Sequence, residues 1–101
     1  MKIDLKPNEQ VIKAEDSIYL NGMPVKGKFI LTNQRIYFRP LSDYDPKYNI
    51  EILPAEIREV IPFKTGLFSN RGLNIVIKSG KELNFNIPDR DIWCKLINKM
   101  Y

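Results

Sequence analysis

The stretch Gly27-Lys28-Phe29-Ile30-Leu31-Thr32-Asn33-Gln34-Arg35-Ile36-Tyr37-Phe38 decides the fold, because it has the pattern of two strands joined by a tight turn. A two-residue turn at Asn33-Gln34 places Leu31 opposite Ile36 and Phe29 opposite Phe38. The apolar residues then share one face of both strands, and a slip of one residue would mix the faces. We therefore predict a hairpin of residues 25–32 and 35–39 in this register. Its apolar face holds Phe29, Leu31, Ile36 and Phe38, and its outward face holds Lys28, Ile30, Thr32, Arg35, Tyr37 and Arg39.

Short apolar or alternating runs predict the remaining strands, at residues 11–20, 49–53, 57–63, 73–77 and 83–87. The last two runs flank Gly80 and form a second hairpin. A two-residue turn there would oppose Ile77 to Glu82. We therefore expect a longer loop that pairs Ile77 with Leu83 and sets Lys78 opposite Glu82, a favourable cross-strand charge pair. Ile75 then pairs with Phe85, and Leu73 with Ile87.

The last segment has the pattern of an amphipathic helix. Pro88-Asp89 is a helix-start signal, with Asp89 as the expected N-cap. One apolar stripe at helical spacing is predicted to cover an open end of a strand barrel; it consists of Ile92, Trp93, Leu96, Ile97 and Met100. We expect Trp93 to be the main core anchor and Cys94 to be a buried small residue rather than a reactive thiol.

These motifs resemble the GRAM/pleckstrin-homology-like family. The hairpin is similar to its signature of Gly, a hydrophobic stretch, Leu-Thr-Asn, one residue, Arg, then Ile/Leu and Phe, and Ile52–Val60 resembles the block that follows. The resemblance covers residues 10–100. It implies a mainly β fold with one C-terminal α-helix, a bent antiparallel seven-stranded barrel that the helix caps. It also implies a module that binds membranes, phosphoinositides or proteins, and the chain resembles small stand-alone bacterial members.

Composition favours one non-enzymatic domain over residues 1–101. The chain has no histidine and a single cysteine, so histidine-assisted nucleophiles, disulfides and common metal sites have no residues to build them. We expect no cofactor and no metal. Apolar runs reach only about three residues, far short of the roughly 20 that a membrane helix needs. We expect a cytoplasmic protein without a targeting segment, whose membrane association, if any, is peripheral at the inner face.

Positive charge is concentrated in two blocks. Residues 17–42 and 60–81 each hold four Lys or Arg residues and no acid, within a chain of net charge +4. They suggest a basic face if the fold brings the blocks together; a solvated surface, or neutralisation by the acidic stretch 43–59, is the alternative. The predicted ligand-binding residues are Lys26, Lys28, Arg35, Arg39, Lys64, Leu67, Phe68 and Arg71.

The loop of residues 64–71 carries the apolar pair Leu67-Phe68 between Lys64 and Arg71. An apolar tip with a basic rim is suited to shallow insertion into an anionic membrane; the alternatives are burial in the core or against a second subunit. The sequence thus predicts a peripheral membrane or anionic-ligand binding module. The second hypothesis is a protein-interaction or homo-oligomerising domain without a lipid ligand. Nucleic acid is the least favoured partner, since only Tyr37 between two arginines suggests it.

Overall fold

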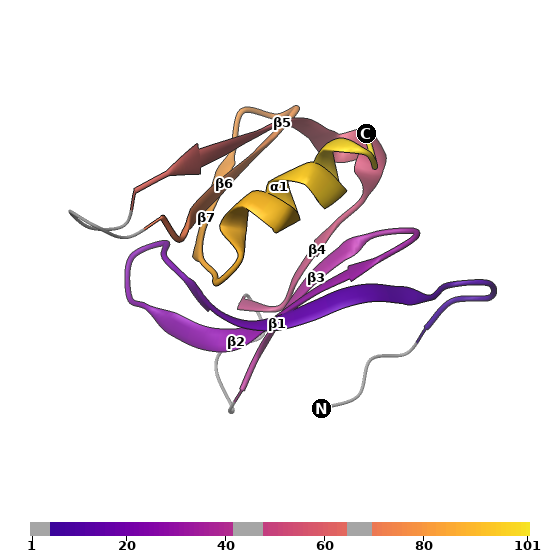
Figure 1. Cartoon of the computed structure of the whole chain (residues 1–101), viewed down its shortest axis with the longest axis horizontal. Coiled ribbons are helices and arrows are strands. Elements are labelled where there is room, and N and C mark those ends of the chain that lie inside the picture. The colour runs from indigo at the N-terminus through magenta and orange to yellow at the C-terminus, as the bar shows by residue number, and fades with distance from the viewer. Residues whose placement is uncertain (1–4, 42–47, 65–69) are drawn as a thin grey trace.

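The computed structural model describes residues 5–41, 48–64 and 70–101 as one antiparallel sheet followed by a helix (Figure 1). The strands are β1 (Val11–Tyr19), β2 (Val25–Thr32), β3 (Ile36–Pro40), β4 (Ile50–Ile52), β5 (Ile57–Phe63), β6 (Gly72–Ile77) and β7 (Glu82–Asn86); a 3₁₀ turn, η2 (Pro54–Glu56), precedes β5, and the helix is α1 (Arg90–Asn98). The seven strands have the order β4-β3-β2-β1-β7-β6-β5. Among the described residues, the edge strands β4 and β5 do not pair, so the sheet curls without closing.

The central hairpin has the predicted register. Leu31 pairs with Ile36, Phe29 with Phe38 and Lys28 with Arg39. The four residues of the apolar face are buried in the core. Gly27 begins the signature because β2 and β3 approach closely there: a Cβ at this position would lie 2.4 Å from the carbonyl oxygen of Arg39 and 2.5 Å from the Phe38 ring.

The outward face of the hairpin differs from a solvated surface. Its half next to the turn is buried, including Ile30, Thr32, Arg35 and Tyr37. The chain ahead of β1 lies against this part of the hairpin, since residues 7–10 hydrogen-bond to residues 33–35 between β2 and β3. Both faces of the hairpin are therefore covered at this end, and only the other end of the outward face stays open.

The predicted register of the second hairpin is wrong by two residues. Ile75 pairs with Leu83 and Leu73 with Phe85, while Glu82 lies opposite Val76 instead of Lys78. The shift is even, so the same side chains still face the core. Its cause is Gly80, whose φ of 96° suits the last position of a three-residue loop. The predicted pairing had placed this glycine in the middle of the loop, where a positive φ is not required.

The helix packs against β5 and β6 and buries Trp93 and Ile97 completely. The Trp93 ring meets the Phe29 ring edge-on at 4.9 Å, which confirms its role as core anchor. Ile92, expected in the buried stripe, is 50% exposed. Asp89 occupies the N-cap position but its side chain makes no capping hydrogen bond, because its backbone is left-handed (φ 56°). Arg90 instead fixes the helix start by donating from Nη1 to the carbonyl oxygens of Phe63 (2.9 Å) and Gly72 (3.0 Å).

Strand β1 joins the two halves of the sheet. It pairs with β2 along its length, but with β7 only through Ile18 and Tyr19. A bulge between Val11 and Lys13 interrupts the ladder with β2. Within the described residues, the β1 edge from residue 11 to residue 17 therefore has no neighbouring strand on the side of the helix.

Candidate functional site

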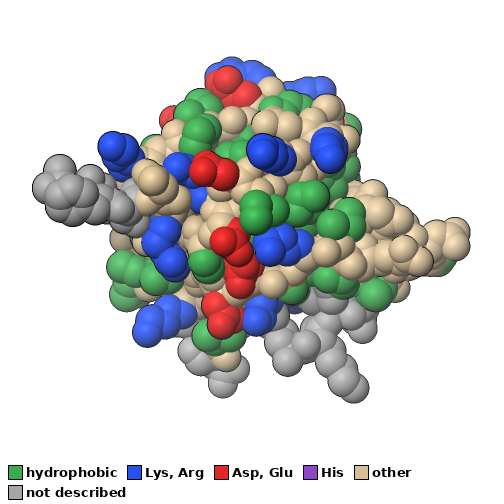
Figure 2. Space-filling model, in the orientation of Figure 1, with side chains coloured by type: hydrophobic (Ala, Val, Ile, Leu, Met, Phe, Trp, Pro, Cys, Tyr) green, Lys and Arg blue, Asp and Glu red, His purple; other side chains and the backbone are tan. Residues whose placement is uncertain are grey.

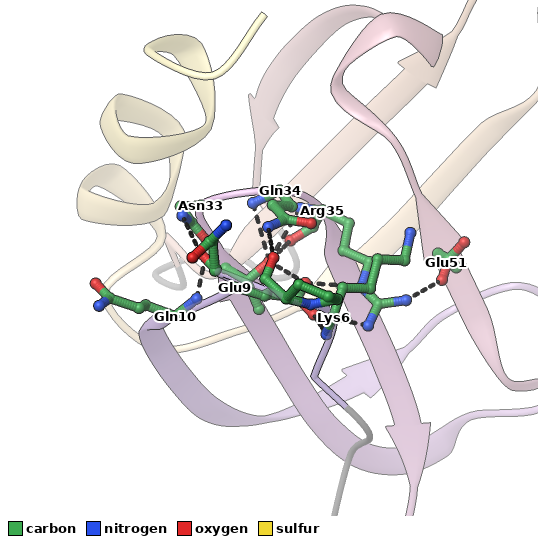
Figure 3. Close-up of polar contacts among 10 residues, drawn as sticks. Lys6, Glu9, Gln10, Asn33, Gln34, Arg35 and Glu51 are labelled. Carbon is green, nitrogen blue, oxygen red and sulfur yellow. Dashed lines mark hydrogen bonds and ion pairs between the residues drawn. The ribbon is translucent and has the colours of Figure 1, made fainter.

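The signature Thr32-Asn33-Gln34-Arg35 holds the N-terminal segment in place (Figure 3). Arg35 donates hydrogen bonds from Nε and Nη2 to the two different oxygens of the Glu9 carboxylate, each at 2.7 Å. Its Nη1 donates to Glu51 Oε2, also at 2.7 Å. Thr32 Oγ1 also donates to Glu9, at 2.6 Å. This bidentate geometry is the strong form of an ion pair. Arg35 thus binds two carboxylates of its own chain.

The two middle residues of the signature extend this contact along the backbone. Asn33 accepts from the Gln10 N–H through Oδ1 (2.8 Å) and donates to the Asn8 carbonyl through Nδ2 (3.0 Å). Gln34 Nε2 donates to the Pro7 carbonyl at 3.0 Å. These side chains satisfy backbone groups of the segment, as asparagine and glutamine amides do in turns.

Electrostatics reinforce the cluster. Hydrogen bonds from Arg35 lower the pKa of Glu9 to about 2, against the opposing effect of burial. The pKa of Arg35 is raised in turn, first by its hydrogen bonds to Glu9. Both groups stay charged at any physiological pH. Sequence reasoning missed Glu9, because it precedes the first predicted strand and no periodicity linked it to Arg35.

Three of the predicted basic residues share the open end of the outward face. Lys28 and Arg39 lie opposite each other on β2 and β3, and Lys26 is the next outward residue of β2. Lys28 Nζ forms an ion pair with Asp16 Oδ1 at 2.7 Å, which relieves the like-charge opposition. Arg39 lies over the Tyr37 ring at 5.2 Å. Its Nε is buried and has no hydrogen-bond partner among the residues that the structure describes.

The second basic block contributes Arg71 to the same region. Arg71 and Lys26 line one depression of about 270 Å³, together with Asp16, Ser17, Ile18, Gly27 and Leu41. Arg71 is positioned there by a 2.7 Å hydrogen bond from Nε to Asn86 Oδ1. Leu41 is 59% exposed and gives the depression an apolar side. We call Lys26, Lys28, Arg39, Arg71 and Leu41 the basic face.

The rest of the second block is divided between the two ends of the sheet. Lys64 directly follows β5, beside the start of β6, and is exposed. Lys78 and Lys81 flank the β6–β7 turn at the opposite end. Leu67 and Phe68 lie outside the described residues. Figure 2 shows Lys and Arg side chains spaced along the left side of the molecule, where Figure 1 places the β1–β2 turn and the end of β5, with acidic side chains nearer the centre.

The described part of the chain contains neither a cluster of metal-binding side chains nor a membrane-spanning helix. Its Cys, Asp and Glu residues form no group of three or more able to hold a metal ion. No helix formed by the described residues is long and apolar enough to cross a membrane.

The architecture is that of a pleckstrin-homology-like domain. The Vps36 N-terminal PH domain matches it with a TM-score of 0.68 at 17% identity, over 95% of this chain and 81% of that one. The C-terminal domain of an unknown protein from Leishmania infantum matches with a TM-score of 0.79 at 12% identity, over 93% and 85% of the two chains. The DH/PH structure of p115-RhoGEF gives 0.75 at 8% identity, over 94% of this chain and 30% of that one. At these identities the likeness concerns the fold.

The sequence itself matches the model of the GRAM domain over residues 1–100, and the chain belongs to that family. No curated protein sequence matches it. Domains of this family and fold are typically non-catalytic binding modules, often for lipids or proteins. The resemblance found in the sequence is thereby confirmed, as is the expected fold.

Proposed function

We propose that this domain binds anionic membrane surfaces peripherally through the basic face. The observation that carries the proposal is the meeting of the two basic blocks: Arg71 from the second block lines the same depression as Lys26 from the first. Lys28 and Arg39 extend the positive charge across β2 and β3. In the described part of the chain, Asp16 is the one carboxylate that forms an ion pair with any of these four cations.

An apolar contact complements the charge. Leu41 is exposed beside Lys26, to whose carbonyl oxygen its N–H donates at 3.0 Å. Basic side chains near an anionic leaflet contribute about 1 kcal/mol each, and apolar atoms that enter the headgroup region add to binding. Leu67-Phe68 would extend the inserted surface, with Lys64 at its rim. The proposed location is the cytoplasmic side of a membrane. Arg35 is not part of the proposed surface, because its guanidinium is buried against Glu9 and Glu51.

Sedimentation with vesicles tests the proposal. The chain is mixed with vesicles of phosphatidylcholine containing 30% phosphatidylserine, or of phosphatidylcholine alone, at two salt concentrations. Removal of two cations by Lys26→Gln/Arg71→Gln is expected to weaken binding by about 2 kcal/mol, roughly thirtyfold. Lys78→Gln/Lys81→Gln removes the same charge at the opposite end of the sheet and serves as the matched control. Phe68→Asp tests the loop separately.

If both double variants lose the same vesicle affinity, binding depends on net charge alone. That result would overturn the basic face as a site. Displacement of the domain from vesicles by millimolar inorganic phosphate would identify a soluble phosphate group, rather than a lipid surface, as the ligand. Absence of binding to either vesicle leaves the second hypothesis, a protein-interaction or homo-oligomerising domain, in its place.

A further inference from the structure

A second candidate site lies toward the other end of β1 from the basic face, between the start of β1 and the C-terminal part of α1. A groove of about 330 Å³ is lined by Ile12, Leu31, Thr32, Asn33, Leu96, Lys99 and Met100. Ile12 is 53% exposed, and Leu96 and Met100 are only partly buried. None of the five residues of the basic face lines this groove, although Asp16 and Ser17, farther along β1, border the depression beside Lys26.

The bulge in β1 explains why an apolar side chain stands at this groove. The register places Val11 opposite Thr32 and Lys13 opposite Leu31, so Ile12 is the extra residue. Bulges re-aim side chains at sheet edges. Here Ile12 lines the groove together with residues of the helix. The Lys13 ammonium lies 5.6 Å from the centre of the Trp93 ring, which positions the lysine between strand and helix.

A backbone edge without a neighbouring strand continues along β1 from Ile12, at one end of the same groove. Residues 13–17 of β1 pair with β2 on one side and, within the described chain, with no strand on the other. Alternate N–H and C=O groups of such an edge point outward and can pair with an added strand. The helix packs chiefly against β5, and Ala14 and Asp16 of this stretch are exposed. Five residues of edge span about 17 Å, enough for an extended peptide of similar length.

The charges around the groove select among peptides. Lys99 lines the groove and Lys95 is exposed one turn earlier on the helix. Neither forms an ion pair among the described residues. Lys13 adds a third cation, with Glu15 at 3.6 Å as its partner. Acidic side chains on an incoming strand would find complementary charge at the helix side of the groove.

We propose that this groove binds an extended acidic peptide of a partner protein, which adds as a strand to β1 and places an apolar side chain between Ile12 and Leu96. Strand addition supplies backbone hydrogen bonds for affinity, and the apolar pocket and basic rim supply specificity. A second copy of this chain fits less well, because its own β1 edge would bring a further Lys13 toward Lys95 and Lys99.

Fluorescence anisotropy with three labelled nine-residue peptides tests the proposal. The first alternates isoleucine with glutamate, the second alternates isoleucine with lysine, and the third is the first with a central proline, which removes a backbone donor and disrupts strand pairing. We expect the glutamate peptide to bind at least tenfold more tightly than either of the others. In an NMR titration, the amide signals of residues 13–17 should shift on binding.

Two variants locate the peptide. Ile12→Asp is expected to reduce affinity for the glutamate peptide at least tenfold, whereas Ile61→Asp, at a similarly exposed position of β5, should leave it unchanged. Lys99→Glu should weaken the glutamate peptide three- to fivefold and strengthen the lysine peptide. Circular dichroism checks that each variant is folded.

Three results would overturn the proposal: equal binding of all three peptides, no binding of the glutamate peptide at 1 mM, or shifts confined to the basic face. A dimer in light scattering that Ile12→Asp dissociates would assign the groove to a second copy instead.

Discussion

Arg35 holds Glu9 by two hydrogen bonds of 2.7 Å, one to each carboxylate oxygen, although 25 residues separate the two in the chain. The side chains of both residues are at least 95% buried. The arginine of the family signature therefore acts as an anchor for the segment before β1. On the same outward side of β2 and β3, the guanidinium of Arg35 also lies over the Tyr37 ring, 4.1 Å from its centre.

Removal of the charge on Glu9 should destabilise the domain strongly. Glu9→Gln takes from the buried guanidinium of Arg35 the carboxylate that it binds with two hydrogen bonds, and breaking a buried pair in this way costs about 3–5 kcal/mol. Urea denaturation followed by tryptophan fluorescence of Trp93 measures the loss. Glu59→Gln is the control, because the Glu59–Arg58 pair is exposed at 3.8 Å and should contribute under about 1 kcal/mol. A loss below that value for Glu9→Gln would contradict the anchoring role.

The same contact predicts how stability depends on pH. The pKa of Glu9 falls from its ordinary value of 4.5 to about 2 in the folded domain. Its contribution is therefore complete above pH 4.5 and declines as the pH falls from 4.5 toward 2. We expect the stability difference between the wild-type chain and Glu9→Gln to shrink over that interval. Urea midpoints for both proteins at pH 7, 4, 3 and 2.5 check this, and a difference that stays constant would exclude Glu9 as the titrating group.

Gly27 should not tolerate a side chain. An added methyl group would meet the Arg39 carbonyl oxygen at 2.4 Å, so β2 and β3 would have to separate. Overpacking of this kind costs about 1–3 kcal/mol. Thermal unfolding of Gly27→Ala should show the loss. Gly80→Asn is the comparison: the space around it is open and asparagine accepts a positive φ, so its effect should be smaller. The reverse order of the two would place the close approach elsewhere.

Arg90 should hold the start of the helix to the ends of β5 and β6. Arg90→Met keeps much of the buried aliphatic stem but leaves the carbonyl oxygens of Phe63 and Gly72 without this donor. We expect a loss of about 2 kcal/mol and faster amide exchange in the first turn of α1. The neighbouring variant Asp91→Asn removes an exposed partner and should alter stability by less than about 1 kcal/mol. Unchanged exchange in Arg90→Met would show that packing of Trp93 alone fixes the helix.

The parts of the fold that sequence predicted correctly are those where several constraints agree. Phe29, Leu31, Ile36 and Phe38 alternate in step across a turn of fixed length, which leaves one register. In the second hairpin, two registers that differ by two residues bury the same side chains. The positive φ of Gly80 decides between the two registers. The pattern of apolar residues carries no information about that backbone angle.

The candidate site was partly predictable for the same reason. Charge counting indicated that two blocks could meet, and Lys26 and Arg71 do. It could not show that Arg35 is paired with Glu9, because an ion pair between residues far apart in the chain produces no periodic pattern in the sequence. The outward face of the hairpin is otherwise polar but carries Ile30 and Tyr37. These two large side chains were the sequence signal that part of this face is covered.

The joint between β1 and β7 has a consequence for how the chain folds. Strands β1 to β4 form a meander of neighbouring strands, and β5 to β7 form another, so each can assemble from nearby residues. The pairing of β1 with β7, in contrast, brings together Ile18 and Asn86, which are 68 positions apart in the chain, and it forms only two residue pairs. Closing so long a loop is entropically unfavourable before other contacts exist. We therefore expect the two meanders to form first and their union to limit the folding rate, with substitutions at Ile18 slowing folding more than those in either hairpin turn.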